Sequence, residues 1–195
     1  NISDGSTIKQ VQGEILDAQS NILADMNDAN SAAVDGNGYV YVATGSFDMR
    51  GTGVGNSSLV KFSPDLNFIW KVDDTLSKGT SHVTVDGATG SIYVIKAAFS
   101  TTNGDSLVEK YDVNGNLLWS SQQFAKGNAF NLVIGLSGDI YVSTSVIEGD
   151  KTNTGIYRLS ASDGSIVKQA TGAFDVGRGE TYSATAIGVD PGRQV

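Results

Sequence analysis

The sequence predicts an all-β protein, because one strand-rich segment occurs three times along the chain. The copies span residues 38–71, 90–120 and 138–169, with a period of about fifty residues. Runs of β-branched and aromatic residues alternate in each copy with Gly, Asn, Asp and Ser, which is typical of short strands joined by turns. Equivalent positions carry Tyr41, Tyr93 and Tyr141, then Lys61, Lys110 and Arg158, then Trp70, Trp119 and Val167. Such a repeat favours a radial or stacked β architecture.

Each complete unit contains four predicted strands. The first strand is rich in small or β-branched residues, which suit a crowded inner strand, and the second is strongly β-forming. The third strand carries the Lys or Arg, and the fourth carries an apolar pair followed by Trp in two units. The predicted strands span 31–35, 39–44, 58–62 and 67–72 in the first unit, 81–86, 91–97, 106–111 and 116–121 in the second, and 131–135, 139–144, 155–159 and 165–170 in the third.

Short and long connections alternate within the units. Strands one and two, and strands three and four, are joined by tight turns of Gly, Asn, Asp and Ser. The other connections are long, and alternate connections of an antiparallel meander lie on the same side. All long loops are therefore expected on one loop face, formed by residues 44–58, 73–80, 96–106, 121–128, 144–155 and 171–181.

Partial units flank the three complete ones. Residues 6–17 match the last two strands of a unit, residues 19–30 then form a connection, and residues 182–190 match a first strand. The sequence thus predicts a single domain over residues 1–195, a β-propeller or partial propeller of about four blades, each a four-stranded antiparallel meander. Its complete blades are predicted at 31–72, 81–120 and 129–170. Either more chain lies beyond both ends, or a second copy supplies the missing strands.

Two pairs of segments carry a resemblance to known repeats. VDGNGYVYVATG is followed by LVKFSPDLNFIW, and VDGATGSIYV by LVEKYDVNGNLLW. These segments resemble bacterial β-propeller repeats of the SBBP type and the broader PQQ-like, quinoprotein-like repeats. The resemblance implies the propeller architecture. Propellers include enzymes, scaffolds and binding modules, so it implies no single function. The third unit departs from the pattern at Gly135 and Val167, and the chain lacks the adjacent cysteines expected of a PQQ-dependent dehydrogenase.

Composition excludes several classes of function. A formal net charge of -8 disfavours nucleic acid and anionic membranes, which need clustered Lys and Arg. No apolar run approaches the roughly 18 residues of a membrane span, so no membrane insertion is expected. The chain has no cysteine, and only 17% of its residues are charged. A polar, weakly charged surface favours an extracellular, cell-surface or periplasmic location.

Most residues of chemical interest have a structural interpretation. Recurrence assigns the tryptophans to packing between blades, and the tyrosine hydroxyls are expected to bond a neighbouring backbone. The Lys and Arg of the third strand are interpreted as cations on its solvent side, paired with a nearby carboxylate, rather than as an anion-binding ring. His82, the only histidine, is interpreted as structural. Oxygen spacings like those of calcium loops, at Asp35 and Asp112, are attributed to turn chemistry.

The long loops contain the candidate site residues. A cation, calcium if any, is expected at acidic loop residues, and no catalytic or cofactor-binding residue is identified. Recurring apolar residues, including Phe47, Phe99 and Phe124, are expected to anchor the loops to the blades. The metal candidates are Asp48, Asp105, Glu148 and Asp150, and the partner-binding candidates are Phe47, Asp48, Met49, Arg50, Asn56, Phe99, Asn103, Asp105, Lys151 and Asn153.

The preferred hypothesis is a non-catalytic binding or structural module of an exported prokaryotic protein. The loop face would recognise a protein or a glycan, because rigid blades that carry long polar loops make an adaptable surface. One alternative is a self-assembling surface or filament component, in which further copies of the chain pair through incomplete end blades. Another is an enzyme, either a quinoprotein-like oxidoreductase or a propeller lyase or hydrolase.

Overall fold

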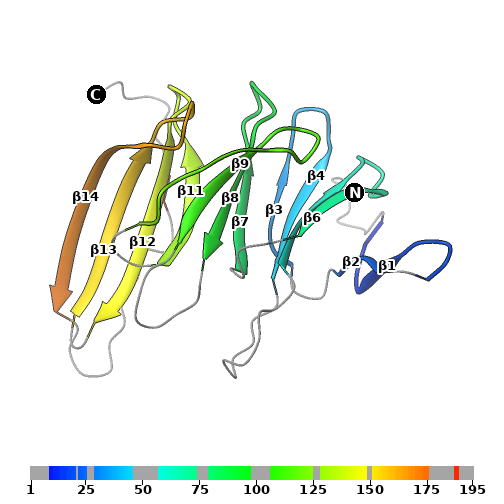
Figure 1. Ribbon diagram of the computed structural model, residues 1–195, viewed down its shortest axis with the longest axis horizontal. Coiled ribbons are helices and arrows are strands. Elements are labelled where there is room, and N and C mark those ends of the chain that lie inside the picture. The colour runs from blue at the N-terminus through cyan, green and yellow to red at the C-terminus, as the bar shows by residue number, and fades with distance from the viewer. Residues whose placement is uncertain are drawn as a thin grey trace, which may run out of the picture.

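The computed structural model confirms an all-β chain. It describes residues 9–20, 22–25, 29–45, 57–73, 79–97, 106–124, 128–148, 151–175 and 187–188. Fourteen strands and no helix lie within these ranges, so no described helix crosses a membrane. Twelve of the strands form three four-stranded antiparallel meanders, which confirms the predicted unit. Figure 1 shows the three sheets side by side.

The three sheets are called the first, second and third blades. The first blade consists of β3 (Ala29–Val34), β4 (Val40–Gly45), β5 (Ser57–Phe62) and β6 (Phe68–Asp73). The second consists of β7 (Gly79–Val85), β8 (Ile92–Ala97), β9 (Leu107–Tyr111) and β10 (Leu117–Ser120), and the third of β11 (Asn128–Ile134), β12 (Ile140–Glu148), β13 (Lys151–Leu159) and β14 (Ile166–Asp175). Within each blade, neighbours in sequence are neighbours in the sheet.

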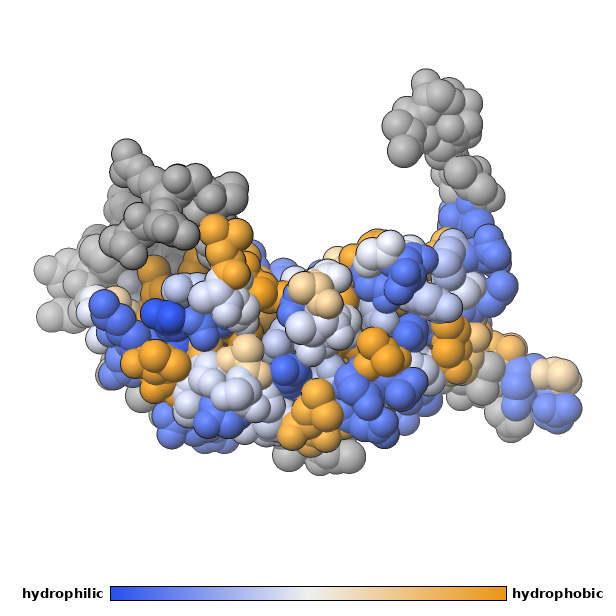
Figure 2. All heavy atoms as spheres, turned by 90° about the horizontal axis from the view of Figure 1, so that it is seen from above, coloured by the Kyte–Doolittle hydropathy of each residue, from blue (hydrophilic) through white to orange (hydrophobic). Residues whose placement is uncertain are grey.

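Apolar residues lie between the blades. One buried cluster joins Tyr41 and Leu59 of the first blade to Val94 of the second. Another joins Tyr93 of the second blade to Tyr157 of the third. Each blade therefore buries one face against the next, and the described residues form an arc that is hollowed on one side (Figure 2). Three blades arranged in an arc are part of a propeller ring.

Turn chemistry explains the aspartates that resemble calcium ligands. The carboxylate of Asp35 accepts hydrogen bonds from the backbone N–H of Asn37 (2.9 Å) and Tyr39 (3.0 Å). Asp112 accepts from the backbone of Asn114 (2.8 Å) and Asn116 (2.9 Å) in the same way. Each carboxylate thus closes its own tight turn, as predicted from the sequence.

The recurring Lys and Trp connect each blade to the next through one carbonyl oxygen. Lys61 Nζ (2.9 Å) and Trp70 Nε1 (3.3 Å) of the first blade both donate to Val113 O, in the β9–β10 turn of the second. The next pair repeats this contact, because Lys110 Nζ (2.9 Å) and Trp119 Nε1 (3.2 Å) both donate to Ala161 O of the third blade. We call this arrangement the two-donor contact.

The prediction that these cations lie on the solvent side was wrong for Lys61. Its side chain is buried, because the neighbouring blade covers the face on which it lies. The ammonium lies 4.5 Å from the ring centroid of Tyr39 and 5.1 Å from that of Tyr41. Burial lowers the pKa of Lys61, and the carboxylates of Asp35 and Asp112 oppose this shift. The aromatic faces and the carbonyl replace the water that the ammonium loses.

Tyr41 also differs from its prediction. Its hydroxyl donates to the carboxylate of Asp35 (3.1 Å) instead of a backbone group. Burial, followed by this hydrogen bond, raises the pKa of Tyr41 well above its ordinary value. Gly135 occupies the position of Asp35 in the third blade, where a Cβ would lie 2.7 Å from Cε2 of Tyr141. The Tyr ring therefore fills the space that the aspartate has in the first blade.

Each Trp ring also covers a glycine of the next blade, which confirms the predicted packing role. The rings of Trp70 and Trp119 lie over Gly115 and Gly164, whose φ angles are 85° and 74°. A Cβ on Gly164 would lie 2.6 Å from Cε3 of Trp119. Glycine is required there both for the left-handed backbone and for the close approach of the ring.

The third blade departs from the predicted loops. Residues 144–155 were expected to form a long loop, but β12 and β13 pair throughout, from Ile140↔Leu159 to Glu148↔Lys151. Strand β14 likewise continues to Asp175, into the connection predicted at 171–181. The polar residues of these segments extend the sheet, because backbone pairing does not require apolar side chains. Figure 1 shows these strands reaching beyond the edge of the other blades.

The N-terminal segment also pairs differently from its prediction. Strand β1 (Glu14–Leu16) pairs with β2 (Ile22–Asp25), which lies in the connection predicted at 19–30. Val11 and Ile15 pack against the outer face of the first blade, in a cluster with Val60 and Phe62. This segment thus covers the face that a preceding blade would cover.

Replacing Gly164 by Ala tests the contact between ring and turn. The change should lower the free energy of unfolding by about 3 kcal/mol. One part of this cost is the left-handed backbone that Ala would have to adopt, and the other is the clash of its Cβ with the Trp119 ring. Gly138 is the matched control, since its φ is 82° and, among the described residues, no atom lies within 4 Å of a Cβ built on it. Gly138→Ala should cost only about 1 kcal/mol. Equal losses in the free energy of unfolding for the two variants, measured in urea, would contradict the contact between Trp119 and the Gly164 turn.

Candidate binding surface at the loop edge

Long connections start and end at one edge of the blades, opposite the tight turns. In the first blade, Gly45 at the end of β4 pairs with Ser57 at the start of β5, and residues 46–56 join them. In the second blade, β8 ends at Ala97 and β9 begins at Leu107. The tight turns lie at the upper edge in Figure 1, so these strand ends define a separate loop edge.

The described residues include little of the predicted site. Phe47, Asp48, Met49, Arg50, Asn56, Phe99, Asn103, Asp105 and Asp150 lie outside them. Glu148 and Lys151 face each other as the last pair of β12 and β13, but their side chains are outside the described part. Asn153 is half-buried in β13 and pairs with Val146 and Ala173. Among the described side chains, no three His, Asp or Glu converge as metal ligands, and the calcium hypothesis stays a prediction.

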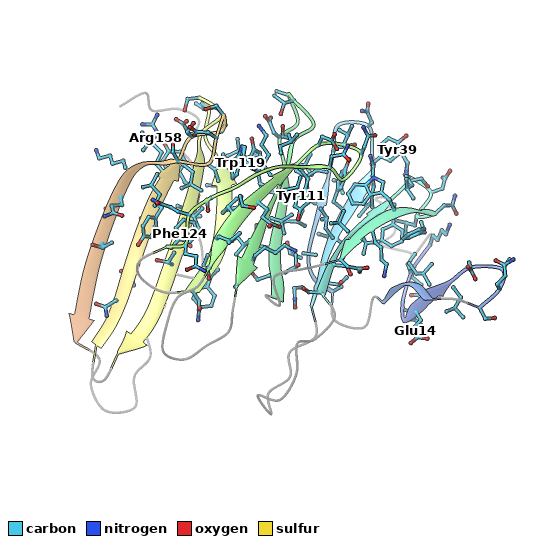
Figure 3. All side chains as sticks on the ribbon, in the orientation of Figure 1. Glu14, Tyr39, Tyr111, Trp119, Phe124 and Arg158 are labelled. Carbon is cyan, nitrogen blue, oxygen red and sulfur yellow. The ribbon has the colours of Figure 1, made fainter. Side chains whose placement is uncertain are left out.

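Phe124 confirms the predicted anchoring of a connection. Its ring is buried and packs on Tyr157 of the third blade, with the centroids 4.9 Å apart. Its backbone N–H donates to Ser106 O (3.0 Å), directly before β9. In Figure 3, Phe124 lies nearer to the loop edge than Trp119 does. The chain leaving β10 is therefore held against both the second and third blades.

Asn30 and Gly45 hold the first and second blades together where residues 46–56 begin. Asn30 Nδ2 donates to Thr80 O (3.0 Å) of β7 and lies 3.4 Å from Gly45 O. A Cβ on Gly45 would lie 3.2 Å from Asn30 Nδ2 and 3.3 Å from Thr80 N, so a larger residue would crowd this junction. The base of this loop is therefore fixed by both blades.

A buried charged pair lies close to this junction, and sequence reasoning missed it. Lys96 Nζ donates to Thr80 Oγ1 (3.1 Å) and lies 3.9 Å from Glu109 Oε2. The Glu109 carboxylate also accepts from the hydroxyls of Tyr111 and Ser120. Side chains two apart on a strand share a face, so Lys96 lies on the same side as Val94, against the first blade. The signal in the sequence that could have revealed this pair is a charged residue inside each of two largely apolar strands, IYVIKA and LVEKY.

Asp73 belongs to a more exposed polar group at the same edge. Its carboxylate accepts from Ser58 Oγ (2.8 Å) and lies 3.1 Å from Lys71 Nζ. Burial acts to raise the pKa of Asp73, but hydrogen bonds from Ser58 and Lys71 outweigh it and lower the pKa below 3.8. The carboxylate thus stays ionised and holds the ends of β5 and β6 together.

His82 lies among the inner strands rather than in a reactive site. Its Nδ1 is 3.5 Å from Ser31 Oγ of β3, and its ring also bonds the backbone of Leu132 of β11. Burial lowers the pKa of His82 from 6.5, and the bond to Leu132 partly opposes this. The imidazole therefore links three blades in its neutral form, in agreement with its structural interpretation.

Comparison with known proteins supports the fold. No family model matches the chain, and no curated protein sequence does. Among solved structures, the chain resembles the Dos1 propeller, with 12% identity and a TM-score of 0.56 over 82% of this chain and 42% of that one. A protein from Lactobacillus plantarum shares 15% identity and a TM-score of 0.48, over 88% of this chain and 51% of that one. A PL25 ulvan lyase shares 14% identity and a TM-score of 0.34, over 69% of this chain and 33% of that one.

The first of these likenesses shows a propeller fold. This chain spans less than half the length of the Dos1 propeller. The described part is therefore a partial β-propeller of three complete blades, as the sequence predicted. At 12% identity, the likeness carries information about architecture and none about a ligand.

Lys96→Met tests the buried pair. The change leaves the Glu109 carboxylate buried without its cation, so the free energy of unfolding should fall by about 3 kcal/mol or more. Lys71→Met is the matched control, because Lys71 pairs with Asp73 at the surface, with 31% and 62% of their side chains exposed. A surface pair contributes less than about 1 kcal/mol. Similar urea midpoints for the two variants would show that Lys96 is not held as described.

His82 should make the free energy of unfolding fall as the pH is lowered through a defined range. The unfolded chain takes up a proton near pH 6.5, but folded His82 resists it, so protonation favours unfolding as the pH falls below that value. Asp73 and Asp86, whose pKa values are lowered from 3.8, affect stability in a separate range, around and below pH 3.8. His82→Gln should therefore flatten urea midpoints between about pH 7 and pH 5. An unchanged slope would contradict the buried neutral imidazole.

Proposed function

We propose that this chain is a non-catalytic binding or structural module of an exported prokaryotic protein. The observation that carries the proposal is the separation of its connections onto two edges. The tight turns are closed by their own aspartate and backbone hydrogen bonds. The long connections at the loop edge start from strand ends that neighbouring blades hold in place. A rigid frame with variable loops is the usual arrangement of a recognition surface.

Residues 46–56 form the principal part of this surface in our proposal. They differ in length and character from the corresponding segments of the other units, while the flanking strands repeat. The third blade has a paired hairpin at the corresponding place, so we assign recognition to the connections of the first and second blades. Residues 46–56 and 98–105 are thus the segments in which we place the contacts with a partner.

The partner we propose is a glycan or a protein, outside the cell or in the periplasm. Only 17% of the residues are charged, and the net charge is -8, which suits neutral polar partners better than polyanions. The repeat motifs favour the SBBP and PQQ-like, quinoprotein-like propeller repeats as the family. Calcium at the acidic loop residues remains part of this proposal.

Shortening one loop tests the proposal. Gly45 and Ser57 are direct partners across β4 and β5, so an Asn-Gly turn can replace residues 46–56 without changing the strands. We expect the wild-type chain to bind a glycan or surface protein in an array of both, and the short-loop variant to lose at least about tenfold in affinity.

A second variant separates loop chemistry from loop length. It keeps residues 46–56 at full length but replaces them with Gly and Ser, and it should lose binding as well. Both variants should keep the wild-type unfolding temperature, because the described contacts lie outside the loop. Unchanged binding by the short-loop variant would contradict recognition through this edge.

A further inference from the structure

The outer face of the third blade repeats the positions that join the other blades, but it is exposed. Leu59 and Val108 hold one position in the first two blades and are 0% exposed, whereas Ile156 at the same position is 48% exposed. Trp70 and Trp119 hold another position and cover the next turn, whereas Val167 there is 54% exposed. The third blade thus presents the side on which each earlier blade binds its successor.

Arg158 retains donors for such a successor. It occupies the position of Lys61 and Lys110, which donate to the carbonyl of the following turn. Its Nε donates to Asp139 Oδ2 (2.8 Å), and one terminal nitrogen donates to the same oxygen. A guanidinium has five N–H donors, so the side chain can also donate to a carbonyl. Figure 3 shows Arg158 near the edge of the tight turns.

The opposite end of the arc carries a matching turn. Gly13 has a φ of 70°, close to those of Gly115 and Gly164. The Trp of the preceding blade covers each of those two glycines, whereas no atom of the described residues lies within 4 Å of a Cβ built on Gly13. Val11 precedes Gly13 by the same spacing as Val113 precedes Gly115, so its carbonyl is the expected acceptor.

The segment around Gly13 already occupies the place of a blade. Lys9 Nζ donates to Asn67 Oδ1 (3.0 Å) and to Asp65 O, in the β5–β6 turn of the first blade. Lys61 reaches the equivalent turn of the second blade. Residues 9–16 are thus joined to the first blade by the same contact between a Lys and a turn, although no Trp takes part. The side of residues 9–16 that faces away from the first blade is the side on which a preceding blade would dock.

We propose that the outer face of the third blade docks on the Gly13 turn of a second copy of this chain. Two complementary surfaces on one chain give a head-to-tail contact, which closes into a ring when the rotation permits. Two copies contribute twice three, or six, complete blades, and each junction adds a partial blade. Counted over residues 1–195 alone, the total falls within the roughly four to eight blades of known propellers, so two copies of these residues are enough to close a ring.

Sedimentation of the 195-residue chain tests this contact. We expect a species of twice 20.3 kDa that dissociates on dilution. Ile156→Lys and Gly13→Asn should each weaken association at least about tenfold, because one puts a charge on the docking face and the other a side chain on the turn. The matched controls are Leu136→Lys, at an exposed position of the β11–β12 turn, and Gly138→Asn, with a φ of 82° and open space. Both controls should associate like the wild type.

A cross-link keeps the test valid if a variant folds poorly. The chain has no cysteine, so Gln12→Cys and Val167→Cys can be prepared separately and mixed. Oxidation should join the two variants into a mixed dimer, whereas Gln12→Cys mixed with Leu136→Cys should not be joined. A monomer at every concentration, or association that Ile156→Lys and Gly13→Asn leave unchanged, would overturn the proposal.

Discussion

At both junctions between complete blades, a backbone carbonyl of one blade accepts two hydrogen bonds from the blade before it. Val113 O receives Lys61 and Trp70, and Ala161 O receives Lys110 and Trp119. Removing an ammonium from water is costly, and here the carbonyl and the aromatic faces offset that cost. The contact also fixes the distance between blades, because the Trp ring fits only over a glycine.

The repeated contact explains the character of both edges. At the turn edge, the side-chain and backbone groups of each turn are used in closing the turn and in receiving the preceding blade. At the loop edge, Asn30 and Phe124 hold the connections at their bases. The long connections therefore carry much of the variation between units, and Gly135 and Val167 are departures within the third blade itself. On the third blade, the positions that contact the following blade in the first two blades are exposed, at Ile156 and Val167.

Local and repeated features were predictable from the sequence, and features that depend on a neighbouring blade were not. The turn role of Asp35 and Asp112 follows from nearby residues, and recurrence was enough to assign Trp70 to packing. The burial of Lys61 depends on a turn 52 residues away, and Lys96 and Glu109 meet across two strands. Residues 144–155 are polar enough to resemble a loop, although pairing extends them as strands. The candidate loop residues, apart from those in β12 and β13, lie outside the described part.

A double-mutant cycle on Lys110 and Trp119 tests the two-donor contact most directly. Lys110→Met and Trp119→Phe each remove one donor and leave Ala161 O with the other. The double variant leaves that carbonyl without either donor, so its loss in free energy of unfolding should exceed the sum of the single losses by about 1 kcal/mol. Losses that simply add, measured by urea unfolding, would contradict a carbonyl shared by the two side chains.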